Sequence, residues 1–184
     1  MRRFALIALL LAAPAALRAT TVVAIEFREL VTTTPVIVQG RVTDVRSAPV
    51  DGRRSVDTFI TVAVDEYLKG DLGRFVTFKV PGGEFGRYRT IVIGAPEFRV
   101  GDEVVLFLKT PSSSVPIIAG FNQGVYRIVA DRDTGRRMVT TPIVMGRDGV
   151  EAERVVRGAP ARKPVPIESF RDTVRDVIAG SAAR

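Results

Sequence analysis

Short segments in which apolar and polar residues alternate, separated by glycine, proline and aspartate, fill most of the chain between residues 36 and 129. Alternation places every second side chain on one face of an extended strand, and glycine, proline and aspartate favour the turns between strands. The strands expected from this pattern are 36–43, 58–68, 75–80, 88–93, 103–108, 115–119 and 125–129. Such a series of short strands predicts an all-β fold, either a barrel or a sandwich.

Two of these segments predict which parts of the sheet are buried. In the first segment, Val36, Val38 and Val42 lie on one face. Gly40 interrupts that face, and a glycine at such a position indicates a bulge or a sharp bend. The segment 103–108 is apolar on both faces, which is typical of a strand that is covered on both sides. We therefore expect it at the centre of the sheet.

The segment 88–93 alternates in the same way and places Arg89, Ile91 and Ile93 on one face. This alternation predicts a full strand of the main sheet. A hairpin loop is expected at 48–54, because this stretch contains a proline and an Asp-Gly pair.

Helices are expected on both sides of the strand-rich region. The first spans residues 25–31 and ends before a proline. A further strand is expected at 137–141, where it pairs with the preceding strand across a short turn. Residues 145–166 contain several prolines and charges without strand periodicity, and this composition predicts a linker. Residues 167–179 have apolar side chains at helical spacing, and Gly180 is placed to cap this helix.

The number of strands, the long second strand and the bulge glycine favour a small five- to six-stranded barrel of the oligonucleotide/oligosaccharide-binding (OB) type. An immunoglobulin-like sandwich is the alternative, and it fits less well because a helix precedes the first strand and the turns are unevenly spaced. The expected organisation is a signal peptide at 1–19, an OB-like β-barrel domain at 20–144, a linker at 145–166 and a helix at 167–180 packed on the barrel.

Residues 1–19 have the order of a secretory signal peptide. Arg2 and Arg3 precede an apolar run, which is followed by small residues up to Ala19. The run is shorter than the roughly 20 residues that a membrane span needs. We therefore expect an exported bacterial protein, periplasmic or extracellular, without stable membrane insertion after cleavage. Cleavage after Ala16 and an uncleaved anchor are the alternatives.

The chain contains no cysteine and no histidine. These absences exclude thiol nucleophiles, Ser-His-Asp triads, and zinc or haem sites that use histidine or thiolate ligands, and no cofactor is expected. The formal net charge is +7, and it falls to +4 when the three arginines of residues 1–19 are removed. Basic and acidic residues are interspersed rather than gathered in a basic patch, so nucleic acid is not an expected partner.

Six motifs follow one another along the chain: FRELV at 27–31, VIVQGRV at 36–42, EYLKG at 66–70, VPGGE at 80–84, FRVGDEVVLFL at 98–108 and GVYRI at 124–128. In this order they resemble a group of small exported bacterial proteins of unknown function. The OB-like barrel of that group is similar to the barrel of tissue inhibitors of metalloproteinases and of netrin-like modules. The resemblance covers residues 20–130 and implies a fold, but it implies no activity because the group has no established one.

Five residues are candidates for binding. Gly82 and Gly83 would let a ligand approach the backbone, although a turn that needs positive φ is the favoured explanation of both. Glu84 and Glu97 flank the same predicted strand and are the pair of carboxylates that a glycan hydrolase would use. Tyr88 lies between them in the sequence and completes the set. No residue is assigned a catalytic or metal-binding role.

These features favour a non-enzymatic binding module that recognises a protein partner through barrel loops, with 81–88 and 94–98 as the binding edge. The first alternative is a carbohydrate-binding barrel or a carboxylate-dependent glycan hydrolase. The second is a structural envelope protein. Five aromatic residues could form a stacking platform for bases or sugars. The competing explanation is that they pack in the core and at the rim of the barrel. These are Tyr67, Phe75, Tyr88, Phe121 and Tyr126.

Overall fold

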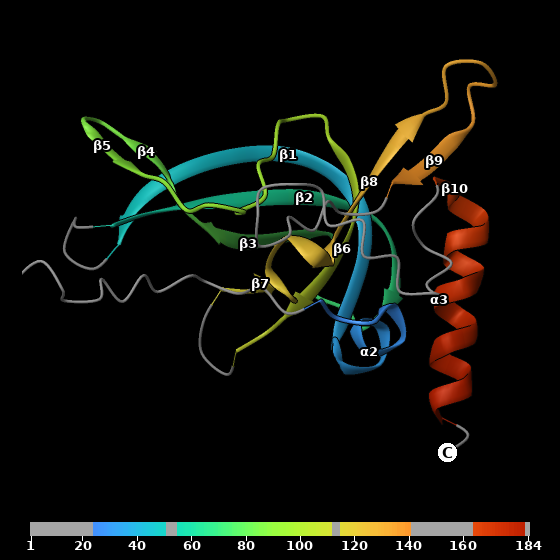
Figure 1. Cartoon of the computed structure of the whole chain (residues 1–184). Helices are drawn as coiled ribbons and strands as arrows, with labels where there is room; N and C mark the ends of the chain where they lie inside the picture. Colours follow the sequence, from blue (N-terminus) through green and yellow to red (C-terminus); the bar gives the residue numbers. More distant parts are fainter. Residues whose placement is uncertain (1–23, 51–54, 112–114, 141–163, 183–184) are drawn as a thin grey trace, which may run out of the picture.

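The computed structural model describes residues 24–50, 55–111, 115–140 and 164–182, which are mostly β-strand with short helices (Figure 1). The all-β fold class expected from the sequence is therefore confirmed. The elements are α2 (Phe27–Thr33), β1 (Val36–Val50), β2 (Ser55–Lys69), β3 (Phe75–Pro81), β4 (Gly83–Phe85), β5 (Tyr88–Thr90), β6 (Glu103–Lys109), β7 (Ile117–Ile118), the 3-10 helix η2 (Phe121–Gly124), β8 (Val125–Ala130), β9 (Arg137–Thr140), β10 (Val165–Pro166) and α3 (Ile167–Ala182). The signal peptide expected at 1–19 lies outside the described residues.

Five strands of the main sheet close into a ring. They pair in the order β1-β2-β3-β7-β6, and β6 pairs again with β1 along Val36–Arg41. Among the described residues, the pairing of β3 with β7 is the only parallel strand pairing. It consists of the single residue pair Lys79 and Ile117. Along the edge that does not pair with β1, β6 also pairs with β8. The strands β9 and β10 follow β8 and extend the sheet away from the ring.

The inside of the ring is filled by one apolar cluster. Val36, Val38 and Val42 of β1 are all buried there, as the alternation predicted. Gly40 marks a break in the β1–β2 register, and a side chain at this position would overlap the Ala63 carbonyl. The predicted bulge is therefore confirmed, and its physical reason is the close approach of the two longest strands.

A second apolar cluster lies outside the ring, between the sheet and the two helices. The strand β6 contributes to both clusters, with Leu106 facing the inside and Phe107 facing the helices. The ring of Phe107 contacts Phe27 of α2 and Tyr126 of β8, and Tyr126 in turn contacts Phe170 of α3. The central position predicted for 103–108 is thus confirmed.

The helix α3 is held on the sheet by its apolar face and by one polar clamp. The Arg171 guanidinium donates two hydrogen bonds to the side-chain oxygen of Gln39 and pairs with Glu66. The Arg175 side chain pairs with the same Glu66 carboxylate at 2.7 Å. The helix continues through Gly180, so the cap expected there is wrong. In the described part of the chain, no helix combines the length and the apolarity needed to cross a bilayer.

The strand expected at 88–93 is wrong in its length and in its partners. Only Tyr88–Thr90 is extended, and it pairs with β4 in a separate two-stranded sheet. The chain then turns, with the Ala95 amide donating to the Val92 carbonyl. Ile91 and Ile93 therefore never reach the core, and they are 73% and 91% exposed. Alternation alone cannot show that a neighbouring strand is missing.

Other boundaries differ in smaller ways. The loop expected at 48–54 begins later, because β1 continues to Val50, and residues 51–54 lie outside the described residues. The strand expected at 115–119 shrinks to the two residues of β7. Most of the linker expected at 145–166 also lies outside the described residues, but its last two residues form β10 and pair with β9.

Candidate binding surface

A groove opens where the β4–β5 hairpin and the segment 91–98 lie over the ends of β1, β2 and β3, and we call it the hairpin groove. Its volume is about 340 Å³, and its lining mixes apolar and polar side chains. Four of the five candidate residues line it, namely Gly82, Gly83, Glu84 and Glu97. Tyr88 does not, because it stands at the tip of the hairpin and is 44% exposed. The structure therefore brings together residues from both predicted loops.

Glycine is required where the hairpin leaves the sheet. Gly82 and Gly83 have φ values of 97° and 140°, which side-chain-bearing residues rarely adopt. A Cβ on Gly83 would overlap the hydroxyl oxygens of Ser47 and Thr58. The Thr58 hydroxyl donates to the Gly82 carbonyl at 2.7 Å, and the Gly82 amide donates to Val56. The glycines therefore serve a turn that packs directly on β1 and β2.

The two glutamates of the groove are in solvent. Glu84 pairs across the hairpin with Arg89 at 3.0 Å, and both side chains are 68% exposed. An exposed pair of this kind contributes about 0–1 kcal/mol. The Glu97 side chain is exposed as well. Neither carboxylate has the apolar surroundings in which a hydrolase holds its general acid.

A second, apolar groove adjoins the first, and we call it the proline groove. It has a volume of about 380 Å³ and shares Val80, Pro81 and Pro96 with the hairpin groove. Ile117 and Phe121 form much of its remaining apolar wall. Its polar part is the ion pair between Lys79 and Asp57, at 3.1 Å. The two grooves together form one continuous surface along 79–98.

Phe121 is held in an unusual backbone conformation at this surface. Its φ is 60° and follows Gly120 at 63°, so both residues are left-handed. A left-handed backbone costs a non-glycine residue about 1–2 kcal/mol. The Phe121 ring lies beside Gly94, and thus against the segment 91–98. Strain of this kind is concentrated at functional sites. The sequence placed Phe121 only in an aromatic platform and gave no sign of this strain.

The expected aromatic platform does not form, because its members are dispersed. Tyr126 is buried under α3, and burial raises the pKa of its hydroxyl. Tyr67 donates to the Gly73 carbonyl beside the β2–β3 connection. Tyr88 stands at the hairpin tip, and Phe121 lines the proline groove. Packing in the core and rim, the competing explanation, therefore fits these residues better.

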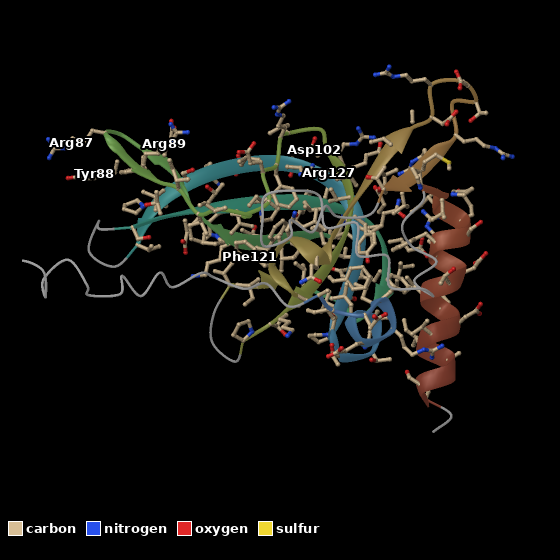
Figure 2. The ribbon with its side chains drawn as sticks, in the orientation of Figure 1. Arg87, Tyr88, Arg89, Asp102, Phe121 and Arg127 are labelled. Atoms are coloured by element: carbon tan, nitrogen blue, oxygen red, sulfur yellow. The ribbon has the colours of Figure 1, made fainter. Side chains whose placement is uncertain are left out.

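Large apolar side chains in solvent concentrate at the hairpin and the segment after it. Of the eight that are exposed in the described residues, four lie between positions 85 and 93. These are Phe85, Tyr88, Ile91 and Ile93. Figure 2 shows Arg87, Tyr88 and Arg89 at the far end of the hairpin, away from the body of the molecule. Clustered exposed apolar residues of this kind mark interaction sites.

The segment 91–98 is anchored at its far end by Arg127 of β8 (Figure 2). The guanidinium donates to the Asp102 carboxylate at 2.9 Å and to the Glu97 carbonyl, and it stacks on the Phe98 ring with its carbon 5.5 Å from the centroid. Phe98 itself is buried in the ring cluster. The sequence did not indicate this anchor, because its members are far apart in the chain.

Within 24–50, 55–111, 115–140 and 164–182, no three acidic side chains are placed to hold a metal ion. At the β8–β9 turn, the Asp131 carboxylate instead accepts hydrogen bonds from the hydroxyl and amide of Thr134 and from the Asp133 amide. The Thr134 hydroxyl bond is the main reason why the pKa of Asp131 is lowered.

Comparison of the chain with protein-family models, with curated proteins and with solved structures gave no match.

Proposed function

We propose that this chain is an exported, non-enzymatic binding module that recognises a protein partner through the surface along 79–98. One observation carries the proposal. Ile91, which lines the hairpin groove, and Ile93, two positions further along the chain, are 73% and 91% exposed, although other apolar side chains of similar size are buried. Each buried Å² of apolar surface is worth about 25 cal/mol, so a partner that covers these residues gains binding energy.

A pre-ordered surface supports this proposal. The hairpin is fixed at its base by hydrogen bonds to β2, and the segment 91–98 is fixed at its end by Arg127. An ordered surface loses less conformational entropy when it binds, so more of the contact energy appears as affinity. The mixture of aromatic, aliphatic and arginine side chains is also typical of the centre of protein interfaces.

We further propose that the five-stranded ring is a small OB-like barrel, similar to that of tissue inhibitors of metalloproteinases and netrin-like modules. The closing pairing of β6 with β1 supports a barrel over an immunoglobulin-like sandwich. Export is proposed from the signal-like order of residues 1–19.

A glycan-binding or hydrolytic function has one observation in its favour, which is that Glu84 and Glu97 line the same groove. The pairing of Glu84 with Arg89 in solvent argues against a general-acid role. The hydroxyl groups of Ser47 and Thr58 are engaged with each other, which leaves them less able to bind a sugar. We therefore favour the protein partner over both a glycan and a purely structural role.

Site-specific photo-crosslinking tests the proposal. A photoreactive residue replaces Ile93 in the full chain, expressed in its native host, and a matched chain carries it at Val129, which is exposed on β8. We expect one dominant protein to crosslink from position 93 and not from position 129. The absence of a specific protein at position 93, or the same proteins at both positions, would contradict the proposal.

A further inference from the structure

The hairpin tip carries a cation that has no acidic partner in the described residues. The Arg87 guanidinium donates to the Tyr88 hydroxyl at 3.2 Å and lies over the Tyr88 ring, 5.3 Å from its centroid. The nearest acidic residue in the sequence, Glu84, is already paired with Arg89. Arg87 therefore leaves a positive charge beside the exposed rings of Phe85 and Tyr88.

From this juxtaposition we propose that the partner presents an acidic and apolar segment, with a carboxylate at Arg87 and apolar side chains over Phe85, Tyr88 and Ile91. This inference rests on the proposed function, since it names the chemistry of the same partner. Arginine suits the role because its planar fork can hold both oxygens of a carboxylate. Stacking on Tyr88 already orders the guanidinium, which reduces the entropy lost on binding.

The other charges of the surface restrict this acidic preference to the hairpin tip. Lys79 is neutralised by Asp57 in the proline groove. Glu97 lines the hairpin groove with an exposed side chain, and its carbonyl accepts a hydrogen bond from Arg127. Arg99 is exposed in the turn beyond this anchor and does not line either groove. We therefore expect the carboxylate of the bound segment next to Arg87.

Peptide selection tests the inference directly. The full chain is used to select from a phage-displayed library of random peptides, and the most enriched peptide is synthesised and titrated by fluorescence anisotropy. We expect enriched sequences to place Asp or Glu next to Leu, Ile, Phe, Tyr or Trp. We expect Arg87→Glu to weaken binding by about tenfold or more, as reversal of an interfacial charge does, and Arg87→Lys to weaken it less.

The matched control is Arg136→Glu, since Arg136 is also an exposed arginine in a hairpin turn but lies between β8 and β9. It should change the affinity less than about twofold, because a charge remote from an interface is screened within a Debye length of roughly 8 Å. Addition of salt should weaken the wild-type complex and leave the Arg87→Glu complex less affected.

Three results would overturn the inference. They are enrichment of peptides without acidic residues, equal binding by Arg87→Glu, and no enrichment at all. A second assay measures co-sedimentation of the chain with vesicles that contain phosphatidylglycerol. Co-sedimentation that depends on Arg87 would show that the ligand is an anionic lipid and not an acidic peptide. If crosslinking from position 93 still yields one protein, the binding surface stands and only its acidic preference fails. If that crosslink is absent, the proposed function fails as well.

Discussion

The two ends of this molecule differ in whether their large apolar side chains are buried or exposed (Figure 1). At one end, α3 covers the outer face of the sheet, and Tyr126 and Phe170 are buried against each other. At the other end, the β4–β5 hairpin and the segment after it leave Ile91 and Ile93 in solvent. The covered end obtains its stability from contacts within the chain. The open end leaves large apolar side chains uncovered, and the proposed function assigns them to contact with another molecule.

The largest expected effect is at the covered end. Phe170→Ala removes a buried ring that contacts Phe27 and Tyr126. The free energy of unfolding should fall by about 3–5 kcal/mol, the usual cost of replacing a buried phenylalanine by alanine. Urea denaturation followed by circular dichroism measures this change. A loss below about 1 kcal/mol, the scale of an exposed substitution, would show that α3 is not part of the stable core.

Gly83→Ala tests how closely the open end is attached to the sheet. The new Cβ would overlap the Ser47 and Thr58 hydroxyls, so the hairpin must shift. We expect a loss of about 1–3 kcal/mol from overpacking, together with weaker partner binding. Gly86→Ala is the matched control, because Gly86 also has positive φ but a Cβ there meets no neighbour. Equal losses in both variants would assign the effect to backbone strain alone.

Phe121→Asn separates binding from stability at the proline groove. Asparagine tolerates the left-handed backbone better than phenylalanine does, and this gain offsets part of the lost ring contact. The free energy of unfolding should therefore change by less than about 1 kcal/mol, a range typical of sites outside the core. The yield of the crosslink from position 93 should fall. A loss of several kcal/mol in the free energy of unfolding would instead make Phe121 a core residue, and an unchanged crosslink in a stable variant would exclude Phe121 from the binding surface.

The smallest expected effect concerns the β8–β9 turn near the covered end. The pKa of Asp131 should lie below its ordinary value of 3.8, because Thr134 donates hydrogen bonds to the carboxylate. A lowered pKa in the folded state stabilises the fold above pH 3.8, and this contribution is lost as the pH falls through the folded value. An NMR titration measures it. Thr134→Ala should return the pKa toward 3.8, and an unchanged value would contradict the assignment.

Much of the covered end could be predicted from the sequence. The spacing of Phe170, Val174 and Val177 predicted the buried face of α3, and all three are buried. The apolar run 103–108 predicted a strand with two covered faces, and the glycine at position 40 predicted the bulge. These features are local, because periodicity along one element is enough to specify which side is buried.

The open end was predicted less well, because its structure depends on contacts between distant segments. The alternation of 88–93 predicted a core strand, and the sequence could not show that no neighbouring strand pairs with Ile91–Ile93. The sequence predicted that Gly82, Gly83, Glu84 and Glu97 belong to one binding edge, but it could not predict the groove that they line. The Arg127 anchor was missed for the same reason.

One pair of double variants tests the central claim most directly. Ile91→Ser with Ile93→Ser removes the open apolar residues, and Val100→Ser with Val129→Ser removes two others that are exposed elsewhere. The free energy of unfolding should change by less than about 0.5 kcal/mol in both chains. Affinity capture should recover the partner identified by crosslinking with the valine variant and not with the isoleucine variant. A large loss of stability in the isoleucine variant, or full recovery of the partner, would contradict the account.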